Sequence, residues 1–472
     1  MSLAKRYAHE YNKNMATLSA RDKELFETKP VLRSIFILAA PTVIGQLITI
    51  AYNLSDTWFI AQTNDTLQVA AVTLVLPLYL MLTVLSNLFG VGSGSMIASF
   101  LGVEKYDEVK KVSSFAFWIT ILATGAYSLI LLFFREPILF LLGAKDPAIL
   151  KFAADYVFWT IVIGGIPTVL NVVLAHLVRA TGKSLQASVG MAIGALLNIV
   201  LDPIFIFPFG LGLQCKGAAI ATCISNSVAV AYFLIYLFIT RKKNVLSIHI
   251  KHFTVKPELA GKAVVIGLPN AAMTFCATFS NVVLNLLVAG YNTSAVAALG
   301  IVKKIDLVPA HISQGLAQGV LPLLSYNFSA KNRDRVNKAV RYSIIITVTL
   351  GAVFLVFYEV FAHALMSFFI GDAETVEIGT KFIRLHCMAM PLLSLLFLYV
   401  AIFQSKQKSG RAIIVSLFRK GTLDIPLMIA MNVGWPLYGV MLVQPILDFA
   451  SLLLVFLLYY VIPSKGKKLF RI

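Results

Sequence analysis

Two polar residues that could bind a cation stand inside a long apolar stretch of the sequence. They are Asn198 and Asp202, in the run Asn198-Ile-Val-Leu-Asp202-Pro203. Residues four apart share one face of a helix, so the amide and the carboxylate point the same way. An ionised aspartate inside a membrane helix costs about 2.5 to 3.5 kcal/mol on insertion scales, so a chain that keeps one is expected to use it. The pattern indicates a cation or proton site in a transporter.

A purely structural role for Asp202 is the alternative. Pro203 removes a backbone donor, and an Asp-Pro pair can serve only to end or kink a helix or to hold a nearby lysine. A second carboxylate, Asp56, stands fifteen residues after Pro41 in the first apolar segment. Pro41 is predicted to bend that helix. Asp56 could lie near the outer membrane surface, or it could face the same interior as Asp202.

Neutral oxygen donors accompany the two carboxylates. Asn171 and Thr222 stand in apolar segments beside that of Asp202, although single polar residues of this kind often serve only in helix packing. Carboxylate, amide and hydroxyl oxygens suit a hard cation such as Na⁺. A proton would instead need one carboxyl whose proton affinity is raised by burial or by a like charge nearby. The coupling ion is therefore predicted to be H⁺ or Na⁺, and both remain open.

The composition predicts a polytopic membrane protein. Of the 472 residues 58% are hydrophobic and only 13% are charged, whereas soluble domains carry about 25% charged residues. The four cysteines have no metal-ligand spacing and are interpreted as apolar core residues. No phosphate-binding loop, metal cluster or nucleophile–base pair is found, so we expect no enzyme, no cofactor and no metal beyond Na⁺.

Apolar runs of about 20 residues, enough to cross roughly 30 Å of hydrocarbon, recur twelve times. The expected fold is therefore all-α, with twelve transmembrane helices in two six-helix bundles. The predicted spans are 34–61, 68–100, 112–134, 150–178, 184–208, 216–240, 262–290, 296–328, 338–369, 379–404, 411–433 and 437–462.

The positive charge follows the membrane topology. Of the 40 Lys and Arg residues, 30 fall on the side of the N-terminus and 5 on the other side, when the segments between spans are assigned alternately. Cytoplasmic loops carry this excess, so both termini are predicted to be cytoplasmic. The formal charge of +18 is then explained by topology and by attraction to lipid, and no nucleic-acid partner is expected.

The two halves of the chain resemble each other in order. Val69-Ala-Ala-Val-Thr-Leu74 parallels Val296-Ala-Ala-Leu-Gly-Ile301, and Pro41 parallels Pro269. Two halves of six spans have the same orientation, which predicts a cavity between two bundles that rock around it. The expected parts are a cytoplasmic tail (1–33), an N-lobe (34–240), a cytoplasmic linker (241–261), a C-lobe (262–462) and a second cytoplasmic tail (463–472).

Several motifs together resemble the multidrug and toxic compound extrusion (MATE) family, over residues 31–462. They are the Pro41 to Asp56 spacing, Arg179-Ala-Thr-Gly182, Asn198-x-x-x-Asp202-Pro203 and Gly217-Ala-Ala-Ile-Ala-Thr222. The resemblance is greatest to the bacterial drug-exporter branch with its cation site in the N-lobe. One departure is the loop Gln404 to Gly410, which lacks a glycine corresponding to Gly182.

The resemblance implies a V-shaped pair of bundles that exchanges cytosolic organic cations or drugs for inward H⁺ or Na⁺. It further implies a monomer in a bacterial inner membrane. By position, Asp56 and Asp202 match the family's acidic pair, and Asn198 matches the amide one turn before the second aspartate. Thr222 and Asn171 match neutral donors, and Pro41 matches the proline at which the first helix bends.

The second half carries unusual charges in or near its predicted spans. They are Lys303, Lys304, Asp306, His311, His386, Asp424 and Asp448. Internal ion pairs are one explanation, since charges inside membranes usually find partners. A substrate or ion site at Asp306 or Asp424 is the other. The two histidines are candidate proton carriers or polar packing residues.

An antiporter of amphipathic organic cations is the function that these patterns favour. A flippase or exporter of a lipid-linked substrate is the nearest alternative, because the neighbouring Lys303 and Lys304 would suit an anionic headgroup. A passive channel or receptor would not need paired carboxylates in a repeated architecture.

Overall fold

The computed structural model describes residues 17–63 and 65–461, and in this part of the chain it contains helices and no strand. The first half comprises α2 (Ala20–Glu27), α3 (Val31–Ala61), α4 (Thr66–Ser86), η1 (Asn87–Val91), α5 (Gly92–Leu101), α6 (Tyr106–Leu141), α7 (Pro147–Val157), η2 (Phe158–Ile163), α8 (Gly165–Ala180), α9 (Ser184–Ile206) and α10 (Gln214–Thr240). The expected all-α fold is confirmed.

The second half begins after a linker that contains the short turns η3 (Ile250–His252) and η4 (Pro257–Gly261). Its helices are α11 (Lys262–Ala289), α12 (Thr293–Ser329), α13 (Arg333–Phe369), α14 (Ala373–Cys387), α15 (Met390–Ser405), α16 (Ser409–Leu417), η5 (Phe418–Thr422), α17 (Asp424–Gly434), α18 (Gly439–Phe456) and η6 (Leu457–Val461). Residues 1–16 and 463–472 of the predicted tails lie outside the described residues.

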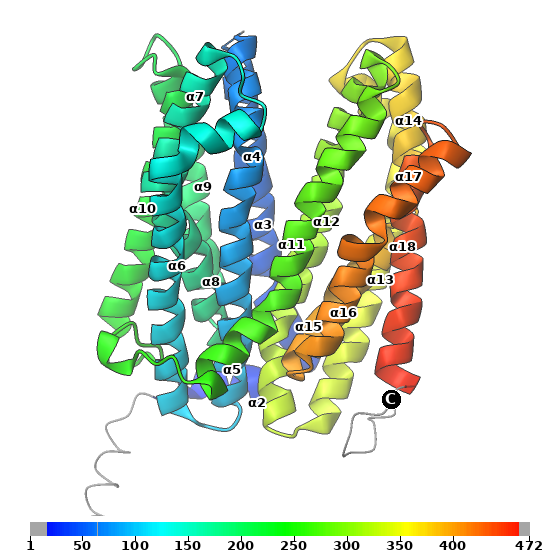
Figure 1. Cartoon of the computed structure of the whole chain (residues 1–472). Helices are drawn as coiled ribbons and strands as arrows, with labels where there is room; N and C mark the ends of the chain where they lie inside the picture. The colour runs from blue at the N-terminus through cyan, green and yellow to red at the C-terminus, as the bar shows by residue number, and fades with distance from the viewer. Residues whose placement is uncertain (1–16, 64, 462–472) are drawn as a thin grey trace, which may run out of the picture.

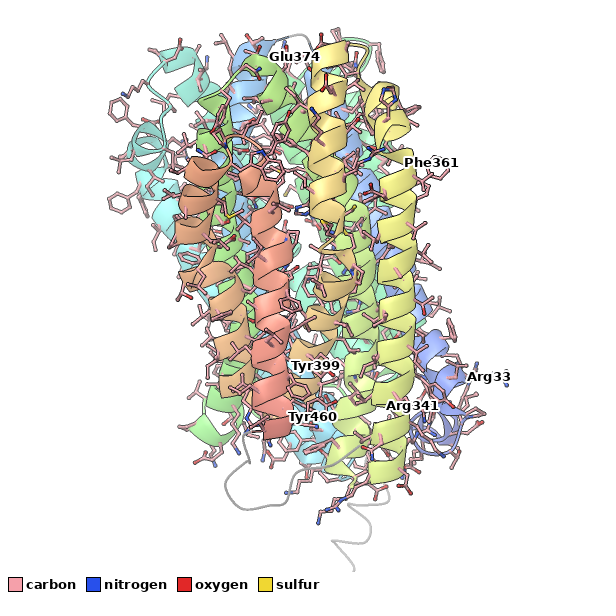
Figure 2. All side chains as sticks on the ribbon, turned by 90° about the vertical axis from the view of Figure 1, so that its right-hand side faces the viewer. Arg33, Arg341, Phe361, Glu374, Tyr399 and Tyr460 are labelled. Carbon is pink, nitrogen blue, oxygen red and sulfur yellow. The ribbon has the colours of Figure 1, made fainter. Side chains whose placement is uncertain are left out.

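The helices form two bundles that stand side by side (Figure 1). One contains α3 to α10 and the other α11 to α18; the bundles approach each other at the end that holds α2 and diverge toward the opposite end. Figure 2 places Arg33 and Arg341 at the end with α2 and Glu374 at the opposite end. We call the end that holds α2, Arg33, Arg341 and the linker the basic end.

The described residues contain eight helices long and apolar enough to cross a membrane, and ten if each of two bent pairs is counted as one span. The bent pairs are Pro147–Ile163 with Gly165–Ala180, at 46°, and Ala373–Cys387 with Met390–Ser405, at 45°. The ten include neither α12 nor the broken α16–α17 segment. Both segments differ from the continuous apolar runs expected there, because η5 breaks the α16–α17 segment into helices of 9 and 11 residues and α12 carries Lys303, Lys304 and Asp306.

Glycine brings the two bundles into direct backbone contact. A Cβ on Gly92 would lie 1.9 Å from the carbonyl oxygen of Ala263, and a Cβ on Gly267 would lie 1.9 Å from that of Leu88. Real Cβ contacts stay above 3.0 Å, so no other residue fits these positions without a shift of the helices. The junction between η1–α5 and α11 therefore depends on the absence of side chains.

Helix α2 lies across this junction. Phe26 is fully buried and stacks on Tyr326 of the second bundle, with ring centroids 4.7 Å apart. Lys183 of the first bundle donates to Asp22 at 2.7 Å, and Asn327 Nδ2 donates to the carbonyl of Phe26 at 3.0 Å. The sequence predicts a solvated segment over 1–33, but α2 differs because one face carries Leu25 and Phe26, which become buried.

We expect Gly267→Ala to destabilise the protein, since its methyl group would overlap the carbonyl of Leu88. Overpacking of this kind costs about 1 to 3 kcal/mol. Gly300→Ala in α12 is the matched control, because its Cβ would meet nothing within 4 Å. Thermal unfolding of the purified variants should show a lower midpoint for Gly267→Ala alone. Equal midpoints for the two variants would contradict the proposed backbone contact.

Candidate cation site

A buried polar cluster joins α9 and α10 in the first bundle. Asp202 is fully buried, and Asn198 and Thr222 are 1% and 3% exposed. Asn198 Nδ2 donates to Asp202 Oδ1 at 3.0 Å and lies 3.3 Å from Thr222 Oγ1. The four-residue spacing on α9 brings the first pair together, and the packing of α10 along α9 adds the threonine.

Asn171 reaches this cluster through a residue that the sequence did not single out. From α8, its Nδ2 donates to Asn226 Oδ1 at 3.0 Å, and Asn226 Nδ2 donates to the backbone carbonyl of Thr222 at 3.0 Å. Asn226 stands one helical turn after Thr222, so the i, i+4 spacing was the available signal. The predicted neutral donors thus lie on three neighbouring helices.

Several oxygens of the cluster are buried without a hydrogen-bond partner among the described residues. They are Asp202 Oδ2, Asn198 Oδ1 and Asn171 Oδ1, together with Asp56 Oδ1. Buried polar atoms are almost always paired, so each of these needs an explanation. A carboxylate oxygen beside amide oxygens fits a cation or a proton, which would satisfy them.

Asp56 faces the interior of the first bundle. It lies on α3, which packs against α9, and it acts electrostatically on Asp202. It also acts on the buried ring of Tyr156, a residue that the sequence analysis missed because tyrosines are common in membrane helices. Of the two predicted placements for Asp56, the buried Oδ1 favours the interior one, and a contact with Asp202 stays a prediction.

Pro41 lies inside α3, which is continuous from Val31 to Ala61. Gly45, one turn after Pro41, approaches Ser188 of α9, because its Cβ would lie 3.3 Å from that side chain. The proline therefore stands close to where α3 meets the helix that carries Asp202. Bending of α3 at Pro41 stays a prediction.

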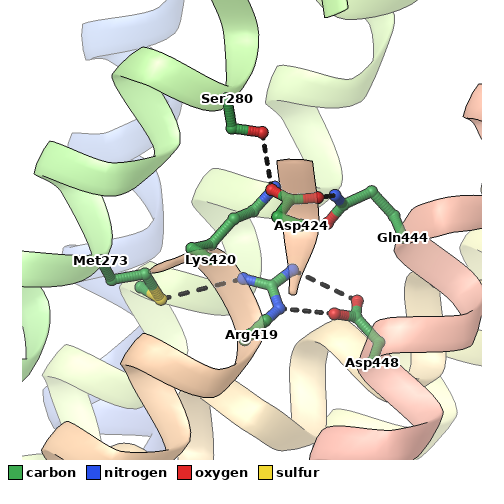
Figure 3. Close-up of polar contacts among 7 residues, drawn as sticks. All are labelled: Met273, Ser280, Arg419, Lys420, Asp424, Gln444 and Asp448. Carbon is green, nitrogen blue, oxygen red and sulfur yellow. Dashed lines mark hydrogen bonds and ion pairs between the residues drawn. The ribbon is translucent and has the colours of Figure 1, made fainter. Parts of the chain in front are cut away.

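The second bundle holds a polar cluster of a different kind (Figure 3). Asp424 accepts from Lys420 Nζ at 3.0 Å, from Ser280 Oγ at 2.6 Å and from Gln444 Nε2 at 2.9 Å. Both carboxylate oxygens are engaged, and the residue is fully buried. This environment is that of an internal ion pair, the first of the two explanations for the charge on α17.

A second buried pair lies next to the first. Arg419 Nε and Nη2 donate to the two oxygens of Asp448 at 2.5 and 3.2 Å, a forked geometry that is favoured for arginine. Figure 3 shows the two pairs side by side on η5, α17 and α18. Neither Arg419 nor Lys420 was singled out from the sequence, although both precede Asp424 by one turn or slightly more.

Asp306 belongs to a separate contact. From α12 it approaches His386 Nε2 of α14 at 3.2 Å, whereas His311 Nδ1 has no hydrogen-bond partner among the described residues. Lys303 Nζ, also on α12, donates to Asn285 Oδ1 at 2.7 Å. Asp306 and Asp424 thus have different partners.

Arg419→Met should destabilise the protein strongly, because Asp448 would be left buried without its partner. Breaking a buried pair in this way costs about 3 to 5 kcal/mol, while replacing both partners with apolar residues is often neutral. We therefore expect the double variant Arg419→Met/Asp448→Leu to unfold at a higher temperature than Arg419→Met. Lys381→Met is the control, since its pair with Glu377 is exposed and worth at most about 1 kcal/mol. A single variant as stable as the native chain would contradict the assignment.

A model of the MatE family matches residues 41–204 and 269–429, one segment in each half of the chain. Multidrug export protein MepA of Staphylococcus aureus is 32% identical over 450 residues, which cover 93% of this chain and 97% of the relative. The protein of the same name from Staphylococcus saprophyticus is 30% identical over 445 residues, with the same coverage.

Solved structures of MATE transporters share the fold. One is described as the outward-facing conformation of a multidrug resistance MATE family transporter of the MOP superfamily. It superimposes with a TM-score of 0.86 at 22% identity, and the match covers 94% of this chain and 97% of that chain. A MOP superfamily transporter from Pyrococcus furiosus gives 0.85 at 21% identity, with the same coverage. The chain is therefore a member of the MATE family of multi-pass membrane transporters, with its twelve-helix fold, and not an enzyme.

Proposed function

We propose that this protein is a secondary active antiporter that exports amphipathic organic cations in exchange for inward H⁺ or Na⁺. The observation that carries the proposal is the buried Asp202 carboxylate with one oxygen unpaired, beside Asn198 and in electrostatic range of Asp56. Two carboxylates in one apolar interior repel each other and are costly to desolvate. Any cation that enters relieves both costs.

The coupling ion is assigned to the oxygens that lack partners. Asp202 Oδ2 and Asn198 Oδ1 are the central donors, and Asp56 Oδ1 supplies the second charge. The Thr222 hydroxyl accepts a hydrogen bond from Asn198 Nδ2, so Asn198 Oδ1 is available to a cation. A proton would instead bind one of the two carboxylates.

Organic cations would compete for the same charge. The relatives from Staphylococcus are named multidrug export proteins, which supports export of drug-like compounds by this chain as well. Tyr52 stands one turn before Asp56 on α3, and its hydroxyl lies 3.4 Å from that of Tyr79. Aromatic rings beside carboxylates suit bulky cations. Binding of either cation then excludes the other, which is the requirement for exchange.

The two bundles supply alternating access. They meet through backbone contacts at the basic end and diverge at the other end (Figure 1). The distribution of Lys and Arg supports a cytoplasmic basic end in a bacterial inner membrane, with both termini inside. In that orientation the bundles diverge toward the outside. Action as a monomer stays a prediction.

The membrane potential drives the exchange only when net positive charge enters, as with two inward ions for each exported monovalent cation; a one-for-one exchange moves no net charge and depends on the ion gradient alone. One charge that moves across 100 mV releases about 2.3 kcal/mol. That energy sustains a drug gradient of about 50-fold, since each tenfold ratio requires 1.4 kcal/mol. An ion gradient adds to it.

A lipid-linked anionic substrate is the second candidate. The observation that favours it is Lys303, which is held by the neutral amide of Asn285 rather than by a carboxylate. Such a cation could receive a phosphate group. The acidic cluster in the first bundle favours cations, and we therefore place this candidate second.

Efflux of a cationic dye from proteoliposomes, with the H⁺ and Na⁺ gradients imposed separately, tests the proposal. We expect one gradient to drive export by the native chain. Asp202→Asn should lower that export at least tenfold, because about 1.4 kcal/mol or more of ion-binding energy is lost. Asp372→Asn is the control, since this exposed carboxylate caps α14 and asparagine caps equally well.

Export unchanged by Asp202→Asn would remove the first-bundle cluster from the mechanism. Absence of dye movement under either gradient, with movement of a lipid-linked substrate, would favour the second candidate. A loss of export in Asp372→Asn as large as that in Asp202→Asn would mean that the carboxylate's location is irrelevant.

A further inference from the structure

A cavity of about 1040 Å³ lies at the basic end of the first bundle, away from the cation site. It is formed by the last turns of α10, by α6 and by the linker that leads to the second bundle. Its wall is apolar on one side and basic on the other. The side chains that matter below are Leu234, Phe238, Ile248, Lys110, Arg241 and Lys242.

The apolar wall continues onto the surface of the bundle. Ile235, Phe238 and Ile239 are 58%, 66% and 74% exposed. They lie on α10, which stands at the outer edge of the molecule in Figure 1. In a multi-pass membrane protein, exposed apolar side chains on an outer helix face acyl chains. With the basic end at the membrane surface, the cavity would open where lipid tails end and headgroups begin.

The basic wall begins where α10 ends. Arg241 and Lys242 directly follow Thr240, both are exposed, and neither forms an ion pair with a described carboxylate. The Arg241 guanidinium stacks over the Phe238 ring at 4.7 Å, which holds it at the mouth of the cavity. Two cations at the headgroup level thus lack acidic partners.

Basic side chains line the cavity and no described carboxylate does, since Lys110, Arg241 and Lys242 belong to its lining. Burial lowers the pKa of the His252 imidazole from its usual value, and the charges of Lys110 and His249 lower it further. Lys110 Nζ lies 3.7 Å from Asp107 Oδ1. Because this ion pair is on the surface, Asp107 offsets the positive charge of Lys110 only in part. A site with excess positive charge at the rim and apolar side chains below is complementary to an amphipathic anion.

We propose that this cavity binds one anionic phospholipid, with its phosphate at Arg241 and Lys242 and its acyl chains along Leu234 and Phe238. The phosphate would receive charge-assisted hydrogen bonds from the guanidinium and the ammonium group. Basic pockets between helix ends at the membrane surface are typical sites for anionic headgroups. The site lies beyond the proposed transport function and does not depend on it.

The linker would be part of this site. Its backbone is held to α6 by three side chains: Ser113 Oγ donates to the carbonyl of Ser247 at 2.9 Å, Ser114 Oγ to that of His249 at 2.9 Å and Trp118 Nε1 to that of Ile248 at 3.0 Å. Ile248 also lines the cavity. A lipid bound there would contact both α10 and the linker, and would strengthen the attachment of the linker to the first bundle.

Native mass spectrometry of the purified full chain, titrated with phosphatidylglycerol or with phosphatidylcholine of the same acyl chains, tests the proposal. Arg241→Gln/Lys242→Gln removes the rim charges. Lys251→Gln/Lys256→Gln removes the same number of charges from exposed positions of the same linker that do not line the cavity. We expect binding of phosphatidylglycerol to weaken about 25-fold in the first double variant, roughly fivefold for each charge, and to stay unchanged in the second.

Equal weakening in the two double variants would overturn the site, because it would show general attraction by surface charge. Equal affinity of the native chain for the two lipids would also overturn it. Lys110→Gln provides a second test if the first double variant unfolds, and its expected effect is a smaller loss in the same direction. The dye-export assay is independent of the lipid titration. A failure of the lipid site and a failure of the proposed transport function can therefore be distinguished.

Discussion

A carboxylate that is buried in the first bundle and only half paired is the constraint on which the rest of this molecule depends. Asp202 receives one hydrogen bond, from Asn198, and its second oxygen has no partner among the described residues. Leaving such a group unsatisfied costs free energy that the packing of α3, α8, α9 and α10 must supply. The proposed exchange depends on this oxygen, because a bound cation or proton would satisfy it.

The buried aspartates of the two bundles differ in their hydrogen-bond partners. In the second bundle, Asp424 accepts three hydrogen bonds and Asp448 is held by a forked arginine, so their charges are already neutralised. In the first bundle, Asp56 and Asp202 each have a buried oxygen without a partner, and no described cationic side chain is bonded to either. The unpaired carboxylate oxygens thus lie in the first bundle, whereas Asp424 and Asp448 of the second bundle are paired, although the two bundles share one fold.

The helices and the core of the cation site could be predicted from the sequence because both depend on local spacing. Apolar runs predict spanning helices, and the i, i+4 rule predicts the contact of Asn198 with Asp202. Contacts between helices could not be predicted: Asn226 joins Asn171 to the cluster only because α8 packs on α10, and Asp424 meets Ser280 and Gln444 only because α11 and α18 pack beside α17. The segment around Phe26 was predicted to be solvated because its partner, Tyr326, is 300 residues away.

Competition between two cations for one buried charge is the central claim, and binding of a cationic dye to the purified chain tests it most directly. Dye binding is measured at increasing Na⁺ concentration, with choline added to keep the ionic strength constant. It is measured separately at decreasing pH. We expect one of the two ions to lower the apparent affinity in proportion to its concentration, and we expect this dependence to disappear in Asp202→Asn. A dye affinity that is independent of both ions, or an ion dependence that persists in Asp202→Asn, would contradict the proposed competition.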